Sequence, residues 1–147
     1  MAVGSKNLEL PVLLPWMRWL LWFAGCYNLV VGVNLVFFYH ELFKTLGLAK
    51  PSPVMFVQLV GLLVALFGAG YLMVARRPLE NRNQLRLGLW SKALGTGLSF
   101  YHVALGNLPA LYLPIVIFSD LVYLPPFVVI LHRLDRLARA AQGSHRA

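Results

Sequence analysis

The chain has 147 residues, of which 59% are hydrophobic and only 12% are charged, and its formal net charge is +8. A soluble domain is usually about a quarter charged, so this composition indicates a membrane protein of single-domain size. The basic residues flank apolar segments instead of forming a basic face with interleaved aromatic residues. We therefore attribute the charge to membrane topology and anionic headgroups, and we exclude nucleic acid as a partner.

Four apolar segments follow one another along the chain, at about 19–38, 54–75, 86–106 and 111–131. Each holds about 20 residues, enough to cross a hydrocarbon core of ~30 Å. We expect a single all-α domain over 1–147, an antiparallel up-down bundle of four transmembrane helices. The remaining stretch, 132–147, has arginines on one side and apolar residues on the other, which predicts an amphipathic basic tail on the membrane surface.

Small residues recur at helical spacing in the first two segments. The ridges are Gly25, Asn28 and Gly32 in the first, and Gly61, Ala65 and Ala69 in the second. Small side chains let helix backbones approach closely, so we expect both ridges to face other helices. Asn34 lies on the opposite side of the first segment.

The small and polar residues of the third segment fall on one helical stripe. At spacings of three or four residues these are Gly88, Lys92, Gly95, Ser99, His102 and Gly106. This period predicts a face that points at neighbouring helices, while large apolar residues cover the other faces. We expect the stripe to face protein along its whole length, which would leave no room for a side chain at Gly95.

Lys92 and Asp120 both lie inside the predicted hydrocarbon, where each charge costs about 2.5–3.5 kcal/mol at a helix centre. In antiparallel spans Asp120 lies about one turn deeper than Lys92, within reach of a long side chain. We interpret the two residues as a buried pair at the base of a polar cavity. Two alternatives remain: Lys92 snorkels to the cytoplasmic surface, or the pair only locks two helices together.

Two prolines, Pro125 and Pro126, follow Asp120 in the fourth segment. They remove two backbone donors and should bend the helix, which frees carbonyls near Leu121 and Val122. A broken helix beside an intramembrane acid is typical of ligand and ion sites. A kink that only improves packing is the alternative.

Three further residues with metal-ligating side chains, His40, Glu41 and His102, are predicted at similar depth near the outer end of the bundle. No His-rich or cysteine-containing ligand motif accompanies them. We therefore expect an interfacial histidine and a hydrogen-bonded one, with no metal and no cofactor.

Four spans place both chain ends on one side of the membrane. That side carries ten basic residues and the other carries two: Lys6, Arg18, Arg76, Arg77, Arg82, Arg86, Arg133, Arg136, Arg139 and Arg146, against Lys44 and Lys50. Because cytoplasmic loops carry the excess of lysine and arginine, we expect both termini to be cytoplasmic.

Several four-span classes are excluded by what the segments lack. Disulfide-generating oxidoreductases need cysteine pairs, and Cys26 is the only cysteine. Small multidrug exporters need a glutamate in the first span, and membrane cytochromes need paired histidines within their spans. Neither feature is present.

Four short motifs occur in order: Tyr27-Asn28 with Gly32, GAGYLMVAR at 68–76, GLWSKALG at 88–95 and SDLVYLPPF at 119–127. In these motifs, which extend over most of the chain, it resembles an uncharacterised family of small four-span bacterial membrane proteins. The resemblance implies a multi-pass protein of the bacterial inner membrane. It implies no substrate.

The leading functional hypothesis is that the protein binds or moves a small lipophilic or protonatable ligand in an intramembrane cavity lined by Asn28, Lys92, Ser99, His102 and Asp120. Its partners would then be that ligand, the bilayer and anionic headgroups. The alternative is a structural or assembly subunit that binds another membrane protein, or a second copy of itself, through the small-residue ridges. A membrane enzyme that uses Asp120 or His102 as an acid–base group ranks third.

Overall fold

A computed structural model describes residues 11–144, and these residues form helices without any strand. The helices are α1 (Pro15–Phe37), α2 (Tyr39–Thr45), α3 (Met55–Arg76), α4 (Arg82–Ala104), α5 (Tyr112–Ser119) and α6 (Leu124–Ser144), with a 3₁₀ turn at Leu121–Tyr123 between the last two. The prediction of an all-α protein is confirmed. Lys6 and Arg146, which contributed to the topology argument, lie outside the described residues.

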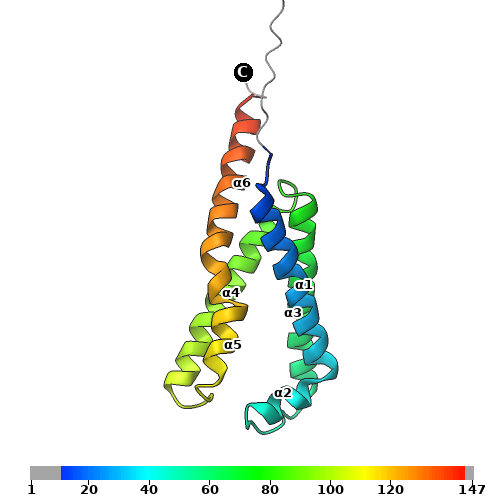
Figure 1. The fold of residues 1–147 in the computed structure, drawn as a ribbon, viewed down its shortest axis with the longest axis vertical. Helices are drawn as coiled ribbons and strands as arrows, with labels where there is room; N and C mark the ends of the chain where they lie inside the picture. Colours follow the sequence, from blue (N-terminus) through cyan, green and yellow to red (C-terminus); the bar gives the residue numbers. More distant parts are fainter. Residues whose placement is uncertain (1–10, 145–147) are drawn as a thin grey trace, which may run out of the picture.

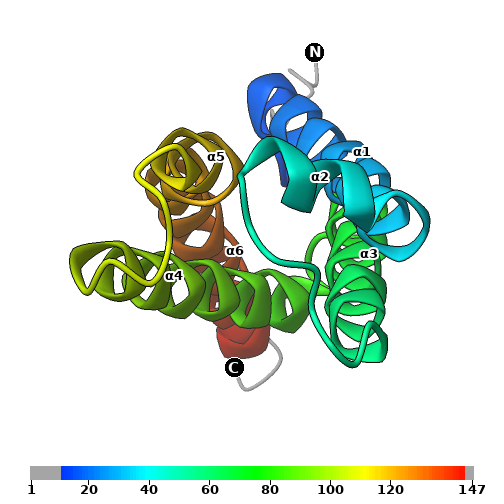
Figure 2. The same cartoon turned by 90° about the horizontal axis from the view of Figure 1, so that it is seen from below.

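The long helices form two pairs, and successive long helices run in opposite directions. α1 packs against α3, and α4 packs against α5 and α6. Viewed from below, the two pairs stand side by side (Figure 2). The start of α1 and the end of α6 lie at one end of the molecule, whereas α2 and the α4–α5 turn lie at the other, where the pairs diverge (Figure 1).

The α1–α3 pair is held together by the predicted small-residue ridges. A Cβ atom added to Gly68 would lie 2.7 Å from the carbonyl oxygen of Gly25, and one added to Gly61 would lie 2.8 Å from that of Gly32. No side chain fits at such distances, so glycine is required where the two backbones touch. The predicted close approach of both ridges is confirmed, although Gly68 takes the place expected for Ala69.

The apolar core lies at the end where α1 begins and α6 ends. Its largest fully buried side chains are Leu21, Tyr71, Val74, Leu85, Phe127, Ile130 and Leu134. Tyr71 lies with its ring centroid 5.0 Å from that of Phe127 in an edge-to-face contact, and its ring closes directly over Gly88. This core joins the two helix pairs at one end only.

Three helical stretches are long and apolar enough to cross a membrane: Pro15–Phe37, Met55–Arg76 and Tyr112–Gln142. Large apolar side chains such as Trp19, Phe23 and Leu66 are exposed on them, as expected of lipid-facing surfaces. The chain is therefore a membrane protein. α4, predicted as a further span, has the length of one at 23 residues, but its polar side chains leave it less apolar than the other three.

The last predicted span is interrupted at Asp120. α5 ends at Ser119, and α6 begins at Leu124 with Pro125 and Pro126 in its first turn. Proline is tolerated there because the first N–H groups of a helix have no intrahelical partner. The predicted broken helix is thus present, as a change from one helix to the next.

The predicted surface tail needs correction. Residues 132–144 are helical, but they continue α6 without interruption, and α6 packs along α4. Leu134 is fully buried in the core, and Asp135 accepts two hydrogen bonds of 2.9 Å from Arg86. The apolar side of this amphipathic segment covers protein up to Leu134, because α4 and the start of α1 lie within its reach.

Candidate functional site

Lys92 and Asp120 form an ion pair between α4 and the α5–α6 break. Lys92 Nζ lies 2.8 Å from Oδ1 of Asp120 and donates a second hydrogen bond of 2.7 Å to the carbonyl oxygen of Ser119. The ring centroids of Tyr123 and Tyr71 lie 5.0 and 5.9 Å from the same ammonium. The Lys92 side chain is only 5% exposed, so it pairs with Asp120 and does not snorkel.

The break in the helix supplies the second acceptor for Lys92. In a continuous α-helix the N–H of Tyr123 would bond to the carbonyl of Ser119. Here it bonds to the carbonyl of Asp120 instead, at 3.1 Å, and leaves the Ser119 oxygen to Lys92. The carbonyls predicted to be freed, those of Leu121 and Val122, do not bind Lys92. The carbonyl oxygen of Leu121 accepts a hydrogen bond from the N–H of Leu124.

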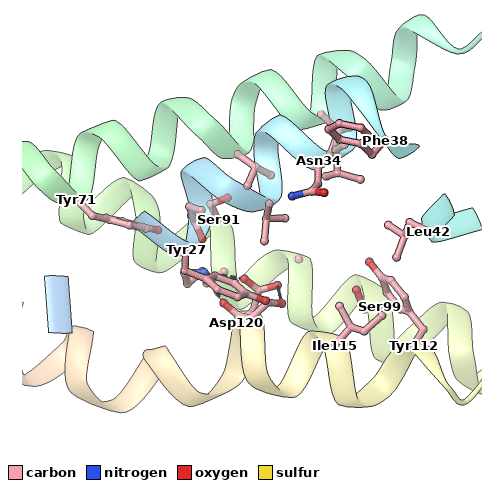
Figure 3. A pocket seen from close by; sticks show the side chains of 18 of the residues that line it. Tyr27, Asn34, Phe38, Leu42, Tyr71, Ser91, Ser99, Tyr112, Ile115 and Asp120 are labelled. Carbon is pink, nitrogen blue, oxygen red and sulfur yellow. Dashed lines mark hydrogen bonds and ion pairs between the residues drawn. The ribbon is translucent and has the colours of Figure 1, made fainter. Parts of the chain in front are cut away.

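The ion pair borders a cavity of about 660 Å³ in the diverging half of the molecule. α1 to α5 all contribute to its wall (Figure 3). The polar lining residues are Tyr27, Asn28, Asn34, Glu41, Tyr71, Ser91, Lys92, Ser99, Tyr112, Ser119 and Asp120. Aliphatic and aromatic side chains make up most of the rest, so polar and apolar side chains share the wall of the cavity.

Four of the five predicted site residues line this cavity: Asn28, Lys92, Ser99 and Asp120. The fifth does not. His102 lies in the last turn of α4, with its Nδ1 3.2 Å from Nδ2 of Asn107 in the turn that follows. Its predicted place in the cavity is wrong, and its interpretation as a hydrogen-bonded histidine holds.

The prediction that the whole stripe on α4 packs against protein also needs correction. Gly88 lies tightly against Tyr71, but a Cβ added to Gly95 would meet no atom within 4 Å. The reason is that the helix pairs touch near the start of α4 and diverge beyond it. Gly95 and Ser99 therefore face the open cavity instead of a neighbouring helix.

Several cavity residues were not predicted, above all the tyrosines. Tyr27 and Asn34 lie seven residues apart on α1, nearly two helical turns, so they share a face. That spacing is the signal that would have placed Asn34 in the cavity. Tyr112 enters at the start of α5, near Ser99 at the far end of the cavity (Figure 3), and no spacing within one helix predicts it.

Metal ligation finds no support in residues 11–144. They contain no group of three or more histidine, cysteine, aspartate or glutamate side chains that could hold an ion. His40 Nε2 lies 3.3 Å from Oε1 of its neighbour Glu41.

Comparisons of the chain with protein-family models, with curated proteins and with solved structures found no match. The function is therefore argued from the cavity and its chemistry.

Proposed function

We propose that this is a multi-pass protein of the bacterial inner membrane that binds a small lipophilic or protonatable molecule in the cavity beside Lys92 and Asp120, either to hold it or to move it. The observation that carries the proposal is an open cavity that reaches a buried ion pair. A purely structural bundle would fill this space with side chains, because protein interiors pack to high density.

The size and lining of the cavity support this role. Ligand pockets usually measure roughly 300–1,000 Å³ and combine an apolar wall with a few polar groups. The cavity, at about 660 Å³, falls inside this range. Its polar groups converge from several helices, which is the arrangement expected for orienting one molecule.

We further propose that α4 is a fourth span and that both termini are cytoplasmic. α4 lies alongside α5 and α6 (Figure 1), so it would enter the bilayer with them. Its buried charge, Lys92, is compensated by Asp120, which removes much of the cost of insertion. The basic residues near the termini and the α3–α4 turn support the orientation.

The alternative, a structural or assembly subunit, relied on small-residue ridges that would bind other membrane proteins. Those ridges are occupied within the chain, where Gly25 and Gly32 of α1 contact Gly68 and Gly61 of α3. They therefore give the alternative no support.

The test is to fill the cavity without disturbing the helix. Gly95→Leu places a side chain in the cavity, and Gly97→Leu is a matched control, because a Cβ at either position meets no atom within 4 Å and only Gly95 lines the cavity. Native mass spectrometry of each purified protein reports the small molecules that remain bound. We expect a molecule on the wild type and on Gly97→Leu that Gly95→Leu has lost.

Two results would contradict the proposal. The first is a wild-type protein that carries no small molecule from its own membrane. The second is an identical set of bound molecules in all three proteins, since a ligand inside the cavity cannot ignore a leucine placed there.

A further inference from the structure

The ammonium of Lys92 is largely engaged within the protein. It carries three N–H donors. One is directed to Asp120 and one to the carbonyl of Ser119, at 2.8 and 2.7 Å, and the ring of Tyr123 lies 5.0 Å away. The side chain is 5% exposed. An anionic ligand in the cavity would therefore find its only nearby cation already engaged.

The carboxylate of Asp120 has acceptor capacity left. Oδ1 receives Lys92, whereas Oδ2 receives only the hydroxyl of Ser119, at 3.2 Å. Each carboxylate oxygen has about two lone-pair sites. The Asp120 side chain is 30% exposed and lines the cavity, so Oδ2 is accessible to a donor that enters it.

The charges along the cavity wall favour a cation. Asp120 and Glu41 each contribute a negative charge, and Lys92 is the single lysine or arginine among the described residues that line it. Glu41 lies on α2, where its side chain is 64% exposed. A ligand cation thus meets a carboxylate on α2 and another beside the break in the helix.

The remaining wall suits the same ligand. Tyr27 lines the cavity together with Asp120, and aromatic faces attract cations. Aliphatic side chains such as Val31, Leu35 and Val60 line the cavity as well. Charged and apolar recognition elements are therefore present in one space.

We propose that the cavity selects a protonated amine on an apolar body, with the ammonium donating to Oδ2 of Asp120. This inference rests on the proposed function and specifies its ligand class. The preference follows from the remaining acceptor capacity of Asp120 Oδ2 and from the existing bonds of Lys92: the cavity offers a carboxylate oxygen to a cation, whereas its one lysine is already paired with Asp120 and the Ser119 carbonyl.

The experiment compares three probes that differ only in the head group: octylamine, octanol and octanoate. Each is titrated against the full-length protein in nanodiscs, and binding to Gly95→Leu nanodiscs is subtracted as partition into lipid. We expect octylamine to bind at least about tenfold more tightly than octanol, because a charge-assisted hydrogen bond is the stronger kind. Octanoate should bind most weakly.

Two variants locate the preference. Glu41→Gln changes an exposed side chain and should weaken octylamine binding a few-fold while leaving octanol binding unchanged. Lys92→Met combined with Asp120→Asn removes both charges of the pair, and when Glu41→Gln is added, octylamine and octanol should bind within about twofold of each other. If the double variant does not fold, the probe series on the wild type still decides.

Each result has one meaning. Octanoate binding more tightly than octylamine, or three equal affinities, would overturn the amine inference and leave a ligand cavity in place. An amine preference as large in the double variant as in the wild type would also overturn it. No saturable binding of any probe above the Gly95→Leu background would contradict the inference and the proposed function together.

Discussion

Lys92 and Asp120 touch at 2.8 Å, yet they are buried to different degrees: the lysine side chain is 5% exposed and the aspartate side chain 30%. The lysine ammonium lies against the rings of Tyr71 and Tyr123, whereas more of the aspartate side chain is open to the cavity that both residues line. Removal of Asp120 therefore leaves an unpaired charge on the more deeply buried residue, and removal of Lys92 leaves one on the more exposed residue.

This asymmetry predicts the energies of a double-mutant cycle. Removing one partner of a buried ion pair costs about 3–5 kcal/mol, because the other charge remains uncompensated. We expect the cost of Asp120→Leu to fall at the upper end of this range, since it leaves the buried ammonium of Lys92 without its carboxylate partner. Lys92→Met should cost less, because Asp120 keeps access to the cavity. Equilibrium unfolding in mixed detergent micelles measures both.

The double variant serves as the control for the cycle. Lys92→Met with Asp120→Leu leaves no unpaired buried charge. The double variant should therefore unfold at a higher fraction of the denaturing detergent than Asp120→Leu alone. Strictly additive free energies would show that the two side chains do not interact in the folded protein.

Gly88 and Gly95 lie on the same face of α4, and we expect opposite responses to alanine. Gly88→Ala forces a methyl group into the ring of Tyr71, and overpacking of this kind costs about 1–3 kcal/mol. Gly95→Ala meets only open space and should be neutral or stabilising, since alanine favours helix by about 1 kcal/mol over glycine. Unfolding curves for the two variants would refute the assigned packing if Gly95→Ala were the more damaging.

The α1–α3 contact gives a second matched pair. A methyl group at Gly61 would lie 2.8 Å from the carbonyl oxygen of Gly32, whereas at Gly70 its nearest neighbour is a side-chain atom of Gln84 at 3.6 Å. We expect Gly61→Ala to separate the two helices and lower stability, and Gly70→Ala to be neutral or stabilising, as for Gly95→Ala. A cross-link between α1 and α3 that forms equally well in both variants would argue against this contact.

Local patterns predicted the helices and the ion pair because both depend on periodicity and depth. The second span was expected at 54–75 and is found at Met55–Arg76. Lys92 and Asp120 were brought together by counting residues along antiparallel helices, a calculation that needs no knowledge of side-chain packing.

The errors share one physical origin, which is that periodicity identifies a face without identifying its partner. The stripe on α4 was taken to pack along its full length, yet the helices diverge, so Gly95 faces a cavity and His102 lies outside it. The apolar side of the segment after 131 was assigned to lipid, yet Leu134 is in the core. The sequence pattern of an apolar or small-residue face is the same whether lipid, protein or empty space lies opposite it.

Two fusion sites decide the topology: the turn between α4 and α5, and the end of the chain. If α4 crosses the membrane, reporter fusions at Leu48 and at Leu108 are both external, and fusions within 77–81 and after Ala147 are cytoplasmic. If only the three most apolar stretches cross, Leu108 lies on the same side as 77–81 and a fusion after Ala147 lies on the other side. We expect an external signal at Leu108, because α4 runs the length of α5 (Figure 1) and its buried ammonium is neutralised by Asp120. The fusion at Leu48 is the control, since both arrangements place it outside when 77–81 is cytoplasmic. A cytoplasmic signal at Leu108 together with an external one at Leu48 would remove α4 from the membrane and the four-span arrangement with it.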